Sequence, residues 1–245
     1  MEQLQTHSRI WEIDALRGLC IPGMILIHLI YDLVDLYGLV DWSCPRWYAL
    51  FKNNYGVLFV LISGLSVTLG SRSVRRGAEI FSMGMVITLV TAVLYRMGLA
   101  DRGILIYFGV LHCLGVCMML WPGLRWLDGR NLVLLGLCLA VAGWWLRGEL
   151  FESGALTVLG LMPRGFRSAD YFPLMPNLGY FLLGAAAGRT LYREKRTRFP
   201  RVNADSPVLR LLSGMGRHSL MIYLLHQPVL TLMCQVFSIW KAGIM

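Results

Sequence analysis

The sequence predicts an all-α polytopic membrane helical bundle of about seven transmembrane helices, with a cytoplasmic N-terminus. Three observations lead to this prediction. Of the 245 residues, 56% are hydrophobic and only 15% are charged, whereas an ordinary soluble domain has about 25% charged residues. Several apolar runs approach about 20 residues, the length that a helix needs to cross a bilayer. Short loops rich in Arg, Gly and Pro separate these runs, as in helical membrane proteins.

The predicted helices follow one another without an internal repeat or a long linker, so we expect one integral membrane domain over residues 1–245. The first run is long and is interrupted by Asp14 and Arg17, which argues against a cleaved signal peptide. The apolar stretch near 153–162 is too short to span and predicts a re-entrant or interfacial segment. The predicted spans are 13–37, 48–70, 78–98, 103–121, 131–147, 171–191 and 218–240.

The basic residues of the loops predict the orientation. With the N-terminus in the cytoplasm, the inside segments carry more Arg and Lys than the outside segments, as the positive-inside rule requires. Most of this bias comes from residues 192–217. The net charge of +9 is then a topology signal. No recognition motif accompanies it, so we do not expect nucleic-acid binding.

The six cysteines form neither a CxxC pair nor a zinc-type spacing with histidine, and no HExxH motif occurs. We therefore expect no metal cofactor and no disulfide framework. Five of these cysteines lie in predicted helices, where cysteine behaves as a small buried apolar residue.

Polar side chains on the first predicted span form one stripe. At about 100° per residue, Asp14, Arg17, His28, Asp32 and Asp35 all fall within about 60° of one another. A charged group in hydrocarbon costs several kcal/mol, so the stripe must face a polar, protein-lined interior. Such intramembrane ionisable residues indicate a functional site.

Three residues of this stripe suggest chemistry. His28 is a candidate general base, because imidazole changes its protonation near neutral pH. Asp32, one turn further on, could orient the ring and stabilise the imidazolium. The alternative is a histidine that only packs between helices.

Arg17 suits the phosphates of a ligand that enters from the cytoplasm. It could also form an ion pair with Asp14, and the two roles can hold together.

Later spans carry further candidates. His112 in the fourth span, and Tyr223 and His226 in the seventh, are expected near mid-depth, where three histidines could converge on one cavity. Each histidine could instead make an interhelical hydrogen bond.

The segment that opens the sixth span contains two prolines three residues apart, which disfavour a regular helix. Irregular backbone at membrane depth usually lines protein or a cavity. Asp170, Tyr171 and Asn177 of this segment could contact a substrate, or the segment could anchor at the membrane interface.

The opening run of the first span resembles the heparan-α-glucosaminide N-acetyltransferase catalytic-domain family; it reads Arg9-Ile-Trp-Glu-Ile-Asp-Ala-Leu-Arg-Gly-Leu. Four later segments resemble the same family, in the same order along the chain. The spacing of Arg17 and His28 resembles the Arg-x10-His signature of the related membrane acyltransferase-3 family. Both resemblances imply transfer of an acyl group, usually acetyl from acetyl-CoA, to a glycan-type acceptor across the membrane. The four segments are Ile62-Ser-Gly-Leu-Ser, Phe108-Gly-Val-Leu-His, Asp170-Tyr-Phe-Pro-Leu-Met-Pro and Gly216-Arg-His-Ser-Leu-Met-Ile-Tyr-Leu-Leu-His-Gln-Pro.

The loop between the first two spans departs from the family pattern. Lysosomal members carry their active histidine there, whereas residues 39–54 contain no histidine. The acyltransferase-3 resemblance therefore makes His28 the main candidate, assisted by Asp32, with Arg17 near the phosphates of acetyl-CoA. The missing loop histidine, together with a chain that is short for the lysosomal enzyme, favours a bacterial envelope sugar over heparan as acceptor. We accordingly expect the protein in a bacterial inner membrane.

Two other functions stay open. Intramembrane Asp and His residues also serve proton-coupled transporters of small molecules, although these often show repeated halves and paired broken helices. The chain could also be a non-catalytic membrane protein of envelope assembly.

Overall fold

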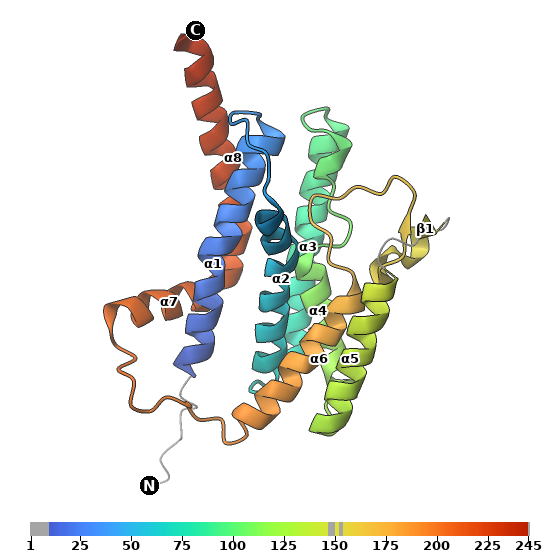
Figure 1. The fold of residues 1–245 in the computed structure, drawn as a ribbon, viewed down its shortest axis with the longest axis vertical. Helices are drawn as coiled ribbons and strands as arrows, with labels where there is room; N and C mark the ends of the chain where they lie inside the picture. The colour runs from blue at the N-terminus through green and yellow to red at the C-terminus, as the bar shows by residue number, and fades with distance from the viewer. Residues whose placement is uncertain (1–9, 147–149, 152–153, 245) are drawn as a thin grey trace. The chain divides into compact units, whose positions relative to one another are not determined.

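The computed structural model describes residues 10–146, 150–151 and 154–244, which are mostly helical (Figure 1). The chain separates into two compact units. Unit 1 comprises Met1–Phe59 and Lys195–Met245, and unit 2 comprises Val60–Glu194. Helix α2, Arg46–Val67, contributes residues to both. The prediction of a single domain stays a prediction.

Unit 1 is built on two helices that run in the same direction, α1 (Trp11–Tyr31) and α8 (Ser219–Ile244). A π-helical turn, η1 (Asp32–Leu36), continues α1. The short helix α7 (Pro207–Arg217) lies across α1 (Figure 1). Ahead of it, the buried Glu12 carboxylate accepts hydrogen bonds from the Thr197 hydroxyl at 3.0 Å and the Arg198 backbone N–H at 2.8 Å.

Two glycines allow α7 to lie directly on α1. A Cβ atom added to Gly18 would collide with the Leu212 carbonyl oxygen, and one added to Gly216 would collide with that of Asp14. Small residues permit this close approach of helix backbones in membrane proteins. The contact fixes α7 beside the segment of α1 that carries Asp14 and Arg17.

Unit 2 packs the end of α2 with α3 (Ser73–Arg96), α4 (Val110–Leu124), α5 (Gly129–Trp145) and α6 (Leu174–Leu191). Glycines bring two pairs of helices close together. Gly77 of α3 faces the carbonyl oxygen of Gly115 on α4, and Gly136 of α5 faces the carbonyl oxygen of Gly179 on α6. The core has fully buried side chains from several of these helices, including Val60, Leu132, Phe181 and Leu182.

Short elements complete unit 2. They are the 3₁₀ turns η2 (Arg102–Ile104) and η3 (Gly154–Leu159), and the two-residue strands β1 (Leu150–Phe151) and β2 (Met162–Pro163), which pair in parallel. The expected interfacial segment near 153–162 thus contains η3 where it is described.

Four helical stretches of the described chain are long and apolar enough to cross a membrane: Trp11–Leu36, Arg46–Val67, Ser73–Arg96 and Ser219–Lys241. Helices α4 and α5 are apolar but shorter. Large apolar side chains point outward from these helices; Leu89 on α3 is 65% exposed and Leu232 on α8 is 62% exposed. The molecule therefore has the features of an integral membrane protein.

Each of the seven predicted spans contains a helix, but the count of seven crossings is not confirmed, and several bounds differ. The fourth helix begins at Val110 rather than near 103, because the preceding backbone is extended and Phe108 forms a β-bridge with Tyr171. The sixth begins at Leu174 rather than 171, since Pro173 precedes it. Helix α7 lies in a stretch that was expected to be a loop.

Candidate functional site

Two histidines of unit 1 lie against each other, one from α1 and one from α8. The rings of His28 and His226 are 4.7 Å apart between centroids and nearly perpendicular. His28 Nδ1 lies 2.9 Å from the Met24 carbonyl oxygen, and His226 Nδ1 lies 2.6 Å from that of Tyr223. A carbonyl oxygen only accepts, so in the neutral rings each Nδ1 carries the proton. The Nε2 atoms therefore keep their lone pairs.

Asp32 lies at the end of α1, one turn beyond His28. Its side chain is fully buried, and Oδ1 accepts a hydrogen bond of 2.8 Å from Gln227 Nε2 on α8. The side chains of Asp32 and His28 form no ion pair or direct hydrogen bond among the described contacts. The carbonyl oxygen of Met24, rather than Asp32, therefore orients the His28 ring.

The backbone at Asp32 is itself unusual, because η1 begins there. The Tyr37 N–H donates to the Asp32 carbonyl oxygen at 2.9 Å, five residues back. Such π-helical turns occur frequently at functional sites. The wider turn also removes Asp35 from the predicted stripe: Asp35 is exposed and lies 3.9 Å from Lys52 Nζ.

Three buried polar atoms of this cluster have no hydrogen-bond partner within the described part of the chain. They are Asp32 Oδ2, His226 Nε2 and Gln227 Oε1. An unsatisfied buried polar atom costs about 1–3 kcal/mol. Most buried polar groups in proteins have partners, so three exceptions in one cluster indicate a site that binds something.

Tyrosine hydroxyls hold the helices around this cluster in place. Tyr37 donates to the Thr231 carbonyl oxygen of α8 at 3.2 Å. Tyr48 and Tyr55, from the first part of α2, donate to carbonyl oxygens of α1, and the bond of Tyr55 to Cys20 measures 2.9 Å. These bonds use backbone oxygens, so they set the spacing of the helices without engaging the polar side chains of the cluster.

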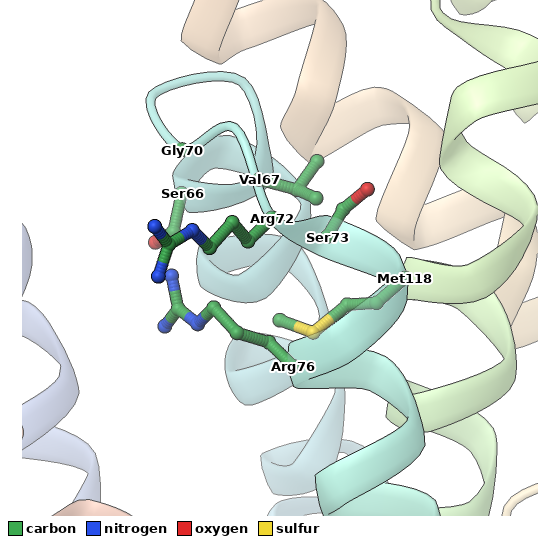
Figure 2. Close-up of a pocket in the computed structure, with 7 residues that line it drawn as sticks. All are labelled: Ser66, Val67, Gly70, Arg72, Ser73, Arg76 and Met118. Carbon is green, nitrogen blue, oxygen red and sulfur yellow. The ribbon is translucent and has the colours of Figure 1, made fainter.

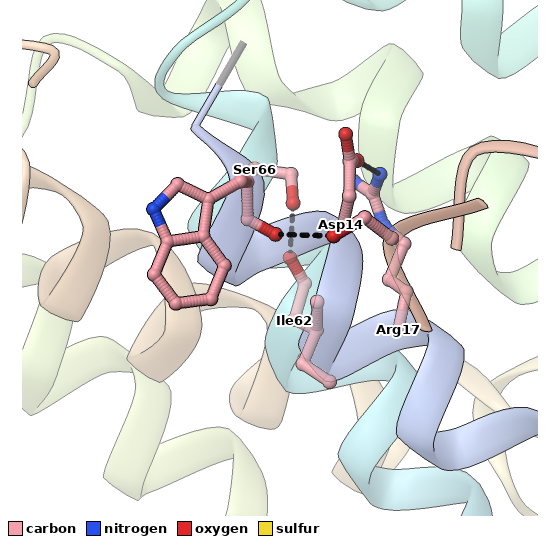
Figure 3. A network of polar contacts seen from close by, with 6 residues as sticks. Asp14, Arg17, Ile62 and Ser66 are labelled. Carbon is pink, nitrogen blue, oxygen red and sulfur yellow. Dashed lines mark hydrogen bonds and ion pairs between the residues drawn. The ribbon is translucent and has the colours of Figure 1, made fainter. Parts of the chain in front are cut away.

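Arg17 and Asp14 form the predicted ion pair on α1, with Nη1 and Oδ1 3.4 Å apart (Figure 3). Both side chains are mostly buried, 20% and 13% exposed. Eleven residues along a continuous helix place Arg17 roughly 16 Å from His28. Figure 3 also shows the Ser66 hydroxyl, which donates to the Ile62 carbonyl oxygen of its own helix at 2.6 Å.

His112 belongs to unit 2, where both of its ring nitrogens are used. The Gly109 N–H donates to Nδ1 at 3.2 Å. The Thr88 hydroxyl donates to the Ile106 carbonyl oxygen at 2.7 Å, so it accepts from His112 Nε2–H at 3.4 Å. These bonds cap the start of α4 and join it to α3. For His112, the structure therefore shows the interhelical hydrogen bond that the sequence analysis gave as the alternative to a role in a shared cavity.

The other candidates of unit 2 bond to backbone groups. Asp170 Oδ2 accepts from the Val110 N–H at 2.9 Å, at the start of α4. Tyr171 donates to the Thr157 carbonyl oxygen at 2.6 Å, and burial raises the pKa of its hydroxyl to about 12, so it stays a donor at neutral pH. Asn177 Nδ2 donates to the Pro173 carbonyl oxygen at 2.8 Å. These contacts hold the segment before α6 against α4 and η3.

A small basic cavity of unit 2 was not anticipated. Its volume is about 10 Å³, enough for about one water molecule. Figure 2 shows the guanidinium groups of Arg72 and Arg76 side by side at its rim. The sequence signal was the pair of arginines four apart at the start of α3. The lining residues are Ser66, Val67, Gly70, Arg72, Ser73, Arg76 and Met118.

Gln227 was also missed, although its neighbour His226 was named. Tyr223 supplies the carbonyl oxygen that orients His226, and its ring lies 5.5 Å from the His226 ring. The available signal for Gln227 was an amide directly before Pro228 in an apolar helix.

Fold and site together define an integral membrane helical protein with a histidine and a buried carboxylate on its first helix. Residues 9–228 match the family model described as heparan-alpha-glucosaminide N-acetyltransferase, catalytic. The match covers most of the chain, so the chain belongs to this family, which confirms the resemblance found in the sequence. The family implies acetyltransferase activity in general. No curated protein and no solved structure matches the chain significantly.

Proposed function

We propose that this protein moves an acetyl group from cytoplasmic acetyl-CoA to an amine or hydroxyl of a glycan-type acceptor on the outer side of a bacterial inner membrane. One observation carries the proposal. In a chain of an acetyltransferase family, His28 presents an Nε2 lone pair beside the buried Asp32 on an apolar, membrane-length helix.

His28 is the proposed catalytic residue. Its Nδ1–H is held by the Met24 carbonyl oxygen, which fixes the ring and leaves Nε2 to act. Nε2 can take the proton of the acceptor as the acceptor attacks the acetyl carbon, a contribution worth about 10²- to 10⁴-fold in rate. The bond between the acetyl carbon and the sulfur of CoA then breaks, and the imidazolium can return the proton to the departing thiolate. It can alternatively carry the acetyl group itself between donor and acceptor.

Asp32 supports His28 by charge rather than by contact. Asp32 lies one turn beyond His28, and in this proposal a negative charge there stabilises the imidazolium that forms when His28 takes a proton. Attraction between opposite charges is stronger in a low-dielectric interior than in water. The hydrogen bond from Gln227 keeps this carboxylate in one position.

Arg17 is the proposed contact for the phosphates of acetyl-CoA. Its planar fork of N–H donors fits phosphate oxygens, and it lies toward the N-terminal end of α1, which we place at the cytoplasmic face. Asp14 orients the guanidinium through the ion pair. Acetyl-CoA supplies the acetyl group as an activated thioester.

The test uses purified protein in liposomes with radiolabelled acetyl-CoA on the side of the N-terminus and a panel of amino sugars and neutral sugars on the other. The proposal expects labelled acetyl bound covalently to an acceptor. Uptake of an unmodified sugar would instead support a transporter. A folded protein that neither transfers acetyl nor transports would support a role in envelope assembly.

A further inference from the structure

The helix that faces His28 carries polar atoms that the proposed transfer step leaves unused. Gln227 and His226 are consecutive on α8, and both meet the end of α1: Gln227 bonds Asp32, and His226 packs on His28. Asp32 and His226 are 0% and 8% exposed. Three atoms of this group are buried without a partner among the described residues.

The unpartnered atoms share one property, which is that each accepts hydrogen bonds. Gln227 donates through Nε2–H to Asp32 Oδ1, which leaves its amide oxygen Oε1 as the atom without a partner. His226 uses its Nδ1–H on the Tyr223 carbonyl oxygen, which leaves Nε2 as an acceptor. Asp32 Oδ2 is a carboxylate oxygen. A binding partner for this cluster must therefore bring N–H or O–H donors.

We propose that Gln227, His226 and Asp32 form a binding site for the hydrogen-donating group of the acceptor substrate, an amine or a hydroxyl of a sugar. The inference rests on the proposed function, and it adds the residues that recognise the acceptor. The His28–His226 contact places a group bound there beside the ring that takes its proton. Gln227 both positions Asp32 and supplies one of the acceptor atoms.

The first experiment measures acetyl transfer while acceptor and acetyl-CoA concentrations are varied separately. Gln227→Met keeps the length of the side chain but removes its polar atoms. The matched control is Gln235→Met, because Gln235 is exposed on the same helix. We expect Gln227→Met to raise the KM for the acceptor about tenfold, because a buried N–H or O–H donor of the acceptor is left without its partner. The KM for acetyl-CoA should change less than twofold, and the control should match the wild type.

The second experiment measures binding without acetyl-CoA, by calorimetry on the detergent-purified protein. The probes are glucosamine, glucose and 2-deoxyglucose, which carry an amine, a hydroxyl and no donor at the same carbon. The wild type should bind the first two more tightly than the third, and Gln227→Met should lose this preference.

The two experiments separate the two proposals. A protein that binds these sugars through Gln227 but transfers no acetyl group would refute the proposed function alone. The acceptor site would be overturned by two results found together. One is that Gln227→Met changes both KM values equally or changes neither, and the other is that sugar binding is absent or does not depend on Gln227.

Discussion

The contact of α7 with α1 at Gly216 makes a sharp prediction about stability. A Cβ at Gly216 would lie 2.6 Å from the Asp14 carbonyl carbon and closer still to its oxygen. Ordinary contacts of Cβ atoms are 3.4–4 Å. The carbonyl oxygen is the nearer atom, so α7 must move away from α1 by more than about 1 Å in a close-packed interior. Overpacking of this kind costs about 1–3 kcal/mol. We therefore expect Gly216→Ala to lower the free energy of unfolding.

Gly214→Ala is the matched control on the same helix. A Cβ there meets only Arg217 Nη2, at 4.0 Å, and replacing glycine by alanine in a helix stabilises it by about 0.5–1 kcal/mol. The two variants should therefore differ by about 1.5–4 kcal/mol. Denaturant unfolding of the detergent-solubilised proteins, followed by circular dichroism, measures this difference. Equal stabilities of Gly214→Ala and Gly216→Ala would refute the packing argument.

Two further predictions concern unit 2. Arg189 donates to two carbonyl oxygens of the connection between α4 and α5, so Arg189→Met should lower the free energy of unfolding by about 1.5–3 kcal/mol. The control Arg193→Met, on the exposed loop, should change stability little. Thermal unfolding of both variants measures this, and equal melting temperatures would contradict the role of Arg189. Thr88→Val removes the hydroxyl that His112 and the Ile106 carbonyl oxygen share and should lower the melting temperature, while Thr88→Ser should retain it. A stable Thr88→Val protein would show that these hydrogen bonds do not hold α3 to α4.

The first helix shows how far the sequence could predict the site. The angular period of an α-helix placed Asp14, Arg17, His28 and Asp32 on one polar stripe, and the Asp14–Arg17 ion pair followed from their spacing. The same period failed for Asp35, because the chain changes from an α-helix to a π-helical turn at Asp32. No pattern of side chains around Asp32 predicts this change of backbone.

Features that join distant parts of the chain could not be read from the sequence. Gln227 meets Asp32 across 195 residues, and no local pattern predicts that contact. The extended backbone before Val110 likewise depends on pairing between Phe108 and Tyr171. Helix α7 is different, because its signal was present: Pro207 stands at the first turn, a position that proline favours. The many charges around it favoured a loop.

The central claim is that His28 carries the acetyl-transfer chemistry. The most direct measurement is single-turnover transfer from radiolabelled acetyl-CoA by the wild type, His28→Ala and the control His218→Ala, which removes an exposed histidine. All three proteins should show the same melting temperature and bind acetyl-CoA equally. We predict that His28→Ala slows transfer about 10²- to 10⁴-fold, while His218→Ala transfers at the wild-type rate. Transfer by a folded His28→Ala protein at the wild-type rate would contradict the claim.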